Sequence, residues 1–348
     1  MKFDFDNRLV GDGAPCYVIA EIGNNHNGDP DKAELLIRAA AKTGADAVKF
    51  QTFKARDIHN PLIAANAYPG FDVSHKFNTW VEYVETTELD YKHYPRLYQV
   101  ANECGVQFLS TPASLEAVGM LDQLGIPAFK IASMDLINKP LLDACANSGK
   151  PIILSTGMSQ LADIDQAVKD LNNSSIAVLH CVSNYPTTDS DVRLFNMNML
   201  AKRYPHVVPG FSSHCSGEEI EIAAVALGAK IIEKHFTLDV NDPDPAEHHV
   251  SISQDSFRYM VSAIRRVEAA FGDEERILTS EEQKNAKLAR RSLVVNRDLK
   301  ASEIVEDKDI ALIRPGTGIP PRHLEEVSGR KLARNIDAWQ ALQWEDLV

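Results

Sequence analysis

The sequence has few cysteines and no long run of apolar residues. Its five cysteines are odd in number and dispersed, and no two of them form a Cys-x-x-Cys pair. This pattern predicts reduced thiols in a cytoplasm-like compartment and excludes a disulfide framework. The first residues, 1–8, are polar and acidic without an apolar signal core, and no later run is long enough to span a bilayer. We therefore expect a cytoplasmic protein with no membrane partner.

The sequence also lacks an excess of positive charge. Lys and Arg number 36 against 49 Asp and Glu, which gives a formal net charge of −13. This balance argues against a general nucleic-acid binder and predicts a soluble surface that repels other copies. It permits an anionic substrate, because local lysines, arginines and helix termini set the field inside a pocket. The length of 348 residues suits a barrel of about 250 residues plus a small second domain.

What the chain does have is a regular alternation of short apolar runs and helical patterns. The first run, 17–22, is followed by a loop rich in Asn, His and Gly and by a helix pattern that starts at Pro30. Eight strand–helix units favour a (β/α)8 TIM barrel, an α/β fold, over the alternative of an open doubly wound sheet. An amphipathic helix at 254–271 closes the series. The other strands are expected at 46–51, 106–110, 128–132, 151–155, 176–181, 207–211 and 230–235.

Two segments depart from this alternation. Residues 52–88 form a long irregular stretch, which inside a compact domain is typical of a lid or a binding wall. Residues 272–287 are acidic and poor in large apolar side chains, and we interpret them as a linker between a barrel domain at 1–271 and a second domain. Residues 288–348 change to short β-like runs and predict a small β-rich domain. The glycines at 314–318 do not join a strand to a helix, so they indicate a turn and not a nucleotide-binding loop.

Each predicted strand ends in polar residues. In a barrel of this type, the carboxyl ends of the strands and the loops that follow form the active face. One such residue is usually a satisfied core group or a turn cap, but eight strands that all end this way are hard to explain by caps alone. The residues, in strand order, are Glu21; Lys49 and Gln51; Ser110 and Thr111; Lys130, Ser133 and Asp135; Ser155, Thr156 and Gly157; Ser183, Asn184 and Tyr185; Ser212, Ser213 and His214; and Glu233 and His235.

These side chains divide into two chemical groups. Lys49 and Lys130, together with several hydroxyls, suit a small ligand that carries both phosphate and carboxylate. His214 and His235 end adjacent strands, so their imidazoles can reach one metal ion and leave other positions open for substrate. The alternative for this pair is two hydrogen-bonded histidines at a polar mouth. The tripeptide 247–249, Glu-His-His, is a competing metal cluster, although neighbouring side chains tend to diverge.

Short motifs recur in order along the barrel. They are AEIGNNHNG at 20–28, VKFQ at 48–51, STP at 110–112, FKIAS at 129–133, LSTGM at 154–158, HC at 180–181 with YP at 185–186, SSH at 212–214 and EKHF at 233–236. The tail adds RRS at 290–292 and RPGTG at 314–318. In this collinear order, over essentially the whole chain, the motifs of the barrel resemble the sialic acid synthase family, and those of the tail resemble that family's antifreeze-like (SAF) domain.

The resemblance implies an N-acetylneuraminate (sialic acid) synthase, which condenses phosphoenolpyruvate with N-acetylmannosamine to give a nonulosonic acid and phosphate. The alternative is a legionaminic or pseudaminic acid synthase, which shares the framework and uses a related 2,4-diacetamido hexose. In such enzymes C3 of phosphoenolpyruvate attacks the sugar aldehyde, which a metal ion polarises. Water then adds at the C2 cation, and the tetrahedral intermediate expels phosphate.

The resemblance also implies a role for each residue by its position. Glu21 would be the acid/base residue, and His214 and His235 would hold a divalent metal, usually manganese, with magnesium or cobalt as alternatives. Arg314 would reach the acyl group of a sugar bound in the neighbouring subunit of a domain-swapped homodimer. Phosphoenolpyruvate would be held by Lys49, Thr111, Lys130, Ser133, Ser155 and Ser212. The sugar site would be lined by Gln51, Asp135, Tyr185 and Glu247.

Four positions depart from the family pattern and leave the sugar open. Asp135 and Glu247 stand where bacterial sialic acid enzymes have Glu and Asp. Ser183 replaces an Asn that helps to bind the phosphate, and Asn184 beside it is the candidate substitute. Ser213 replaces an Asp that often precedes the first metal-binding histidine, which weakens one outer contact of the metal site.

Two rival functions stay open at this point. A Schiff-base aldolase on the same barrel would use Lys130 or Lys234 as nucleophile and needs a desolvated lysine with a lowered pKa. A binding or ice-interacting protein would rest on the tail alone. The complete set of polar strand ends argues against this second rival.

Overall fold

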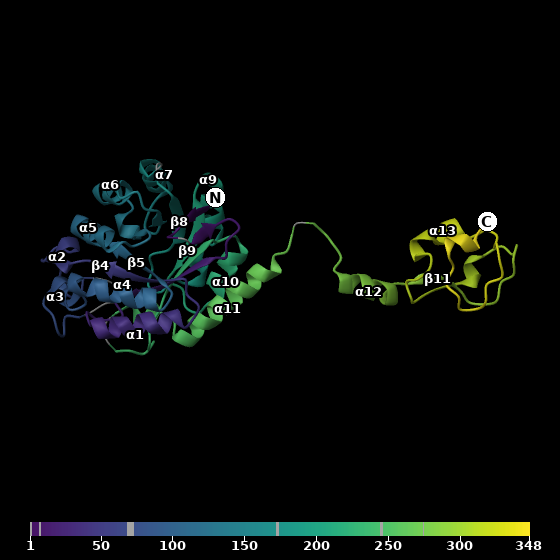
Figure 1. Ribbon diagram of the computed structural model, residues 1–348, viewed down its shortest axis with the longest axis horizontal. Helices are drawn as coiled ribbons and strands as arrows, with labels where there is room; N and C mark the ends of the chain where they lie inside the picture. The colour runs from purple at the N-terminus through teal and green to yellow at the C-terminus, as the bar shows by residue number, and fades with distance from the viewer. Residues whose placement is uncertain (1, 7, 68–72, 172–173, 244–245, 274) are drawn as a thin grey trace. The chain divides into compact units, whose positions relative to one another are not determined.

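The computed structural model describes residues 2–6, 8–67, 73–171, 174–243, 246–273 and 275–348. The chain divides into two compact units, Met1–Phe271 and Gly272–Val348 (Figure 1). No helix among the described residues is long and apolar enough to cross a membrane.

The first unit contains a closed barrel of eight parallel strands. Strand β10 pairs with both β9 and β3, and this pairing closes the ring. The prediction of a TIM barrel is therefore confirmed, and the open sheet is excluded. The strands are short apolar runs because a parallel sheet is covered on both faces. They are β3 (Tyr17–Gly23), β4 (Ala47–Thr52), β5 (Gln107–Pro112), β6 (Phe129–Ile131), β7 (Ile152–Ser155), β8 (Ile176–Cys181), β9 (Val208–Ser213) and β10 (Ile231–His235).

Helices connect successive strands and surround the barrel (Figure 1). Several begin at a side chain that accepts a backbone N–H of the first turn, as Asp29 does for α1 and Ser114 for α5. The helices that follow the barrel strands are α1 (Pro30–Ala41), α4 (Tyr94–Glu103), α5 (Leu115–Leu124), α6 (Lys139–Asn147), α7 (Leu161–Asp170), α8 (Asp189–Val192), α9 (Phe195–Arg203), α10 (Glu219–Ala226) and α11 (Gln254–Ala270).

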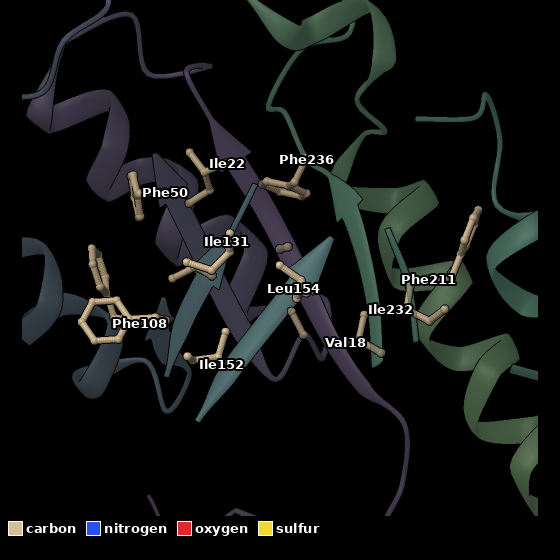
Figure 2. Close-up of a cluster of buried hydrophobic side chains, with 14 of the residues drawn as sticks. Val18, Ile22, Phe50, Phe108, Ile131, Ile152, Leu154, Phe211, Ile232 and Phe236 are labelled. Carbon is tan, nitrogen blue, oxygen red and sulfur yellow. The ribbon is translucent and has the colours of Figure 1, made fainter. Parts of the chain in front are cut away.

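Side chains alternate between the two faces of each barrel strand. In β10, Glu233 and His235 share the inner face, whereas Ile232 and Lys234 lie on the outer face toward the helices. The outer-face cluster includes the residues labelled in Figure 2, which are Val18, Ile22, Phe50, Phe108, Ile131, Ile152, Leu154, Phe211, Ile232 and Phe236. The inner-face cluster fills the barrel toward its amino end with Tyr17, Ile19, Ala47, Leu109, Ala128, Ile153, Ala177, Leu179, Val208 and Ile231.

A short hairpin precedes the barrel and closes its amino end. Strands β1 (Lys2–Asp4) and β2 (Leu9–Gly11) pair antiparallel. Phe5 and Val10 are fully buried and belong to the inner-face cluster of the barrel. The Phe5 ring meets the Tyr17 ring edge-on, with 5.3 Å between the centroids. Since Tyr17 opens strand β3, the hairpin seals the barrel at the end opposite the carboxyl ends of the strands.

The stretch 52–88 forms a side wall with a core of its own. It contains the short helices α2 (Ala55–Ile58) and α3 (Trp80–Glu85), and its residues 68–72 lie outside the described part of the chain. Helix α3 begins with a capping box, in which Thr79 and Glu82 accept each other's backbone N–H. The 3-10 turns of the first unit are η1 (Tyr91–His93), η2 (Ser133–Asp135) and η3 (Glu247–Val250).

The second unit is built on a small hairpin. Strand β11 (Ser292–Val295) pairs antiparallel with β12 (Ile310–Ile313). Helix α12 (Ser280–Ala289) precedes the hairpin and occupies the later part of the predicted linker, of which residue 274 lies outside the described residues. The core of this unit consists of Leu293, Val295, Leu299, Val305, Ile319, Val327, Leu332, Ile336, Leu342 and Leu347. Its remaining elements are η4 (Asp307–Asp309), η5 (Pro321–His323), α13 (Leu324–Val327) and η6 (Trp344–Asp346).

Candidate active site

A cavity of about 620 Å³ opens at the carboxyl ends of the barrel strands. Since inner-face side chains from all sides of the ring converge there, this cavity gathers most of the residues predicted from sequence. Those that line it are Glu21, Lys49, Gln51, Thr111, Lys130, Ser133, Ser155, Ser183, Tyr185, Ser212, His214, His235 and Glu247.

Of the residues that the resemblance places in the site, three do not line this cavity; the predicted strand-end residues Ser110, Thr156, Gly157 and Ser213 do not line it either. Asp135 lies in the turn η2 after β6, where its Oδ1 accepts a hydrogen bond from Asn138 Nδ2 at 2.9 Å. Asn184 lines a second cavity of about 570 Å³, which has residues of α7 and α9 in its wall. Arg314 belongs to the second unit, so its role toward the sugar stays a prediction.

Two lysines and two carboxylates form the floor of the cavity. Lys49 Nζ lies 2.8 Å from Glu21 Oε2 and 3.8 Å from Glu233 Oε2. Lys130 Nζ lies 3.6 Å from Glu233 Oε1 and donates a hydrogen bond to Ser155 Oγ at 2.7 Å. All four charged side chains are buried. Glu233, predicted as a polar strand end but without an assigned role, therefore connects the two lysines. Its place two residues before His235, on the same inner face, was the signal that could have found this role.

Burial and neighbouring charges shift the pKa values of these four side chains in different directions. Burial raises the pKa of Glu21, although the Lys49 ammonium opposes this shift. Burial acts to raise the pKa of Glu233 as well, but Lys130 and Lys49 outweigh it and lower that pKa. Burial lowers the pKa of Lys130, whereas the two carboxylates outweigh burial at Lys49 and raise its pKa. Glu21 is thus the floor carboxyl best suited to hold and release a proton.

His214 and His235 lie side by side at the cavity wall, with 5.3 Å between their ring centroids. His214 Nδ1 lies 2.8 Å from the carbonyl oxygen of Val182 and donates to it, so the lone pair of its Nε2 is available to a ligand. Burial lowers the pKa of His214 to about 4, which keeps this ring neutral at ordinary pH. Burial acts to lower the pKa of His235 too, but Glu247, whose Oε2 is 3.4 Å from His235 Nδ1, outweighs it and raises that pKa.

The donor set at the two histidines fits a divalent ion with open coordination positions. The two imidazoles offer the nitrogen donors that such ions accept and leave other positions for oxygen atoms of water or substrate, and the buried Nδ1 of His235 makes no hydrogen bond, with Glu247 Oε2 3.4 Å away. Among the residues that the structure describes, no group of three or more His, Cys, Asp or Glu is arranged around one metal position. The competing cluster at 247–249 is therefore not formed, and only its Glu247 lines the cavity.

One side of the cavity above the floor is mainly apolar. The stretch 52–88, predicted to be a lid or a binding wall, supplies much of this side, so the interpretation as a wall is confirmed for its described residues. Gln51 connects the floor with the turn η3, because its Nε2 donates to Glu21 Oε1 at 3.1 Å and to Glu247 Oε2 at 3.3 Å. The apolar and aromatic lining residues that sequence reasoning did not single out are Phe53, Ile58, Trp80, Tyr83, Val84, Ala113, Met134 and Met158.

Lys234 does not reach this cavity. It is fully buried on the outer face of β10, where its Nζ donates to Glu221 Oε1 at 2.8 Å and to the Cys215 carbonyl at 2.6 Å. This placement excludes Lys234 as the nucleophile of a Schiff-base aldolase. For the Schiff-base aldolase, Lys130 is then the candidate nucleophile that is left.

Comparison with known families matches both units. The NeuB family matches residues 36–276, and the SAF domain matches residues 290–348. An N,N'-diacetyllegionaminic acid synthase of Legionella pneumophila is 36% identical over 344 residues, which cover 97% of this chain and 96% of that protein. A synthase of the same name from Campylobacter jejuni is 38% identical over 323 residues, or 91% of this chain and 96% of that protein. Human N-acetylneuraminate-9-phosphate synthase is 33% identical over 353 residues, or 98% of this chain and 95% of the human protein.

Solved structures of proteins with related names are similar to this chain as well. The N-acetylneuraminic acid synthetase of Leptospira borgpetersenii has a TM-score of 0.73 at 30% identity and covers 82% of this chain and 95% of its own. The spore coat polysaccharide biosynthesis protein SpsE of Bacillus subtilis has a TM-score of 0.67 at 33% identity and covers 100% of this chain and 99% of its own. The chain therefore belongs to the NeuB family, whose synthases form a carbon–carbon bond between phosphoenolpyruvate and an amino sugar, and it carries a SAF domain.

Proposed function

We propose that this protein is a nonulosonic acid synthase that joins phosphoenolpyruvate to an N-acetylated hexosamine and releases phosphate. The observation that carries the proposal is the convergence of buried lysines, a carboxyl of raised pKa and two histidines in one cavity. The rival Schiff-base aldolase would use Lys130, which is buried with a lowered pKa as that chemistry needs, and borohydride trapping with substrate would label Lys130 only if that rival were right.

The lysine floor is the proposed site of phosphoenolpyruvate. Lys49 and Lys130 supply the positive charge that a phosphate and a carboxylate require in a buried place. Thr111 already accepts a hydrogen bond from Lys49 at 3.1 Å, and Ser155 accepts one from Lys130, so hydroxyls accompany both ammonium groups. These pairs hold the lysine side chains in place before a ligand arrives.

Glu21 is the proposed acid/base residue. A new bond between C3 of phosphoenolpyruvate and the aldehyde carbon leaves an alkoxide that needs a proton, and addition of water at C2 releases one. A carboxyl with a raised pKa can give the first proton and take the second. Its two oxygens are fixed by Lys49 and Gln51, so the group is oriented toward the space above the floor.

His214 and His235 are the proposed ligands of a divalent metal, manganese first and magnesium or cobalt as alternatives. When bound there, such an ion polarises the sugar aldehyde as a Lewis acid. The chain's own part is to keep His214 in the tautomer whose Nε2 is free, through the bond of Nδ1 to Val182, and to place Glu247 beside His235.

The sugar is the finer part of the proposal, and the apolar wall favours a 2,4-diacetamido hexose. A second acetamido group replaces a hydroxyl with a methyl-bearing group, which gains by contact with side chains such as Trp80, Tyr83 and Met158. Two of the relatives described above are diacetyllegionaminic acid synthases. N-acetylmannosamine, the sugar that the sequence resemblance implies first, is the second candidate, supported by the likeness to the Leptospira synthetase.

Phosphate release from phosphoenolpyruvate tests the proposal directly. The purified protein is assayed with manganese and N-acetylmannosamine, a 2,4-diacetamido hexose or N-acetylglucosamine as a control, and the product is identified by mass. We expect sugar-dependent release that stops after chelation and returns with manganese, fastest with the diacetamido sugar. Release that needs no sugar, or full activity after exhaustive chelation, would contradict the mechanism, whereas a preference for N-acetylmannosamine would change only the sugar.

A further inference from the structure

A second charged pair lies behind the active site, on the other face of strand β10. Lys234 and Glu221 are both fully buried, and Lys234 Nζ donates to Glu221 Oε1 at 2.8 Å. Glu221 comes from α10, the helix that packs outside the barrel after β9. The other oxygen of this carboxylate, Oε2, is buried without a hydrogen-bond partner. Neither residue contacts the cavity or takes part in the chemistry proposed above.

Stability alone does not explain such a pair. Removal of two charges from water costs several kcal/mol for each ion, and well-packed apolar side chains in place of a buried ion pair are often neutral or stabilising. The unpartnered oxygen of Glu221 increases that cost. The neighbours of Lys234 on the same face, Ile232 and Phe236, are apolar, so an apolar residue at this position would suit the layer.

The position of Lys234 relative to the two histidines is the informative feature. The parallel ladder between β9 and β10 ends with the pair Lys234–Ser213. His214 and His235 each lie one residue beyond this last pair, so the β9–β10 ladder does not pair the two histidines with each other, although His235 pairs with Glu21 of β3. The Lys234 side chain continues the connection, because its Nζ donates to the carbonyl oxygen of Cys215 at 2.6 Å. Glu221 holds the same ammonium group from the side of helix α10.

We propose that the Lys234–Glu221 pair is a positioning device that fixes the spacing of His214 and His235. Lys234 precedes one histidine, and its ammonium group holds the residue that follows the other. The pair therefore sets the distance between the two imidazoles that would bind a divalent ion, but it contacts neither the ion nor the substrate. This inference rests on the proposed metal site.

The test replaces both charges together, because removal of one alone leaves the other buried and unpaired. In the double variant Lys234→Met/Glu221→Leu, manganese binding is measured by the electron paramagnetic resonance signal of free Mn²⁺, and unfolding by urea. We expect a dissociation constant for manganese about 10- to 100-fold higher than that of the wild type, an unfolding midpoint equal to or above the wild type, and unchanged binding of phosphoenolpyruvate by the metal-free protein.

A matched control disrupts charge at the opposite end of the barrel. Arg265 donates to the Cys16 carbonyl at 2.8 Å and pairs with Asp46 at 3.0 Å, at the amino ends of the strands. Arg265→Met should lower the unfolding midpoint and leave manganese binding at the wild-type level. If manganese binding weakened equally in this control, the effect would be one of general stability and the positioning role would be wrong.

The remaining outcomes separate this inference from the proposed function. Wild-type affinity for manganese in a folded double variant overturns the positioning role while the metal site stands. Absence of manganese binding by the wild type overturns the metal site and this inference with it. If the double variant does not fold, Glu221→Asp decides. It keeps the charge pair but draws the carboxylate back from Lys234, and we expect a several-fold weaker affinity for manganese, whereas an unchanged affinity overturns the role.

Discussion

Glu21 and Glu233 are both buried carboxyls on the inner face of the barrel, yet their pKa values move in opposite directions. Glu233 lies near two ammonium groups, and their combined charge outweighs burial. Glu21 has one lysine at 2.8 Å, and burial prevails. One cavity therefore holds a carboxylate that stays charged beside a carboxyl that can exchange a proton, which is how acid/base roles are divided in many enzymes.

Glu21→Gln tests the proton-transfer role. The amide keeps the size of the side chain and a hydrogen bond to Gln51 but cannot carry the proton, so we expect turnover to fall by about a hundredfold or more. Binding of phosphoenolpyruvate, measured by calorimetry, should change little. A fall of only a few-fold in the steady-state rate would show that Glu21 is a structural carboxylate.

His26 makes the stability of the protein depend on pH. It is buried beside the Phe50 ring, its Nδ1 accepts the Gly28 amide at 3.0 Å, and burial lowers its pKa to about 4. Below about pH 6.5 this histidine binds a proton in the unfolded chain but stays neutral in the folded chain. The free energy of unfolding therefore decreases as the pH is lowered.

Between about pH 7 and about pH 5, this histidine should cost about 2 kcal/mol of unfolding free energy. In His26→Asn, which keeps an acceptor for the Gly28 amide, that part of the pH dependence should disappear. Urea unfolding of metal-free wild type and variant at both pH values measures the difference. Equal pH dependence in the two proteins would contradict the assignment.

At the scale of the element, two loops share one buried asparagine. Asn25, in the loop after β3, donates to the Phe236 carbonyl and to Ser251 Oγ, both at 2.9 Å. Ser251 in turn donates to the carbonyl of Glu247 at 2.6 Å. The loop that follows the first barrel strand thereby holds the turn η3, which carries Glu247 to the cavity.

Asn25→Ala should therefore loosen the position of Glu247. We expect a loss of about 1–3 kcal/mol in unfolding free energy from the unpaired carbonyl, together with a raised KM for the sugar and a nearly unchanged KM for phosphoenolpyruvate. Asn198→Ala is the control, because Asn198 makes a comparable bond to the Leu227 carbonyl at 2.8 Å among the outer helices. Equal effects on the sugar KM in both variants would refute the specific role of Asn25.

The elements differ in how far the sequence could predict them. The carboxyl ends of parallel barrel strands share one face, so Glu21, Lys49 and His235 could be placed in one site before the fold was known. The connection of Glu233 to both lysines depends on strands far apart in the chain that meet only in the closed ring. Helix α12 was missed because none of its residues is buried, so no apolar face marked it in the sequence.

At the scale of the whole molecule, the two units raise the question of how Arg314 acts. It lies directly after β12, in a unit whose small core is separate from that of the barrel. Ser292 Oγ donates to the Pro315 carbonyl at 2.7 Å and accepts the Gly318 amide at 2.8 Å, so the turn that begins at Arg314 is held on both sides. The family resemblance implies that this arginine serves the sugar of a second subunit, which neither composition nor alternation could have predicted.

Complementation tests this cross-subunit role. Glu21→Ala and Arg314→Ala should each be nearly inactive, and the mixture should regain activity after subunit exchange, because each mixed dimer has one site with both residues intact. Exchange is confirmed by native mass spectrometry, and Arg314→Ala alone should bind phosphoenolpyruvate as the wild type does. If exchange occurs without recovery, the arginine serves its own turn and not a neighbouring site.

The hairpin that seals the amino end of the barrel has a consequence for kinetics. Beneath the lysine floor the described barrel is packed with side chains, including Phe5 and Val10 from that hairpin. In the proposed arrangement, phosphoenolpyruvate on the floor therefore enters past the place of the sugar at the mouth. We expect ordered binding, in which a sugar that arrives first blocks the entry. Measurements of initial rates should show inhibition by excess sugar, and higher phosphoenolpyruvate concentrations should relieve it. A rate law for random-order binding would show instead that the cavity has another entrance.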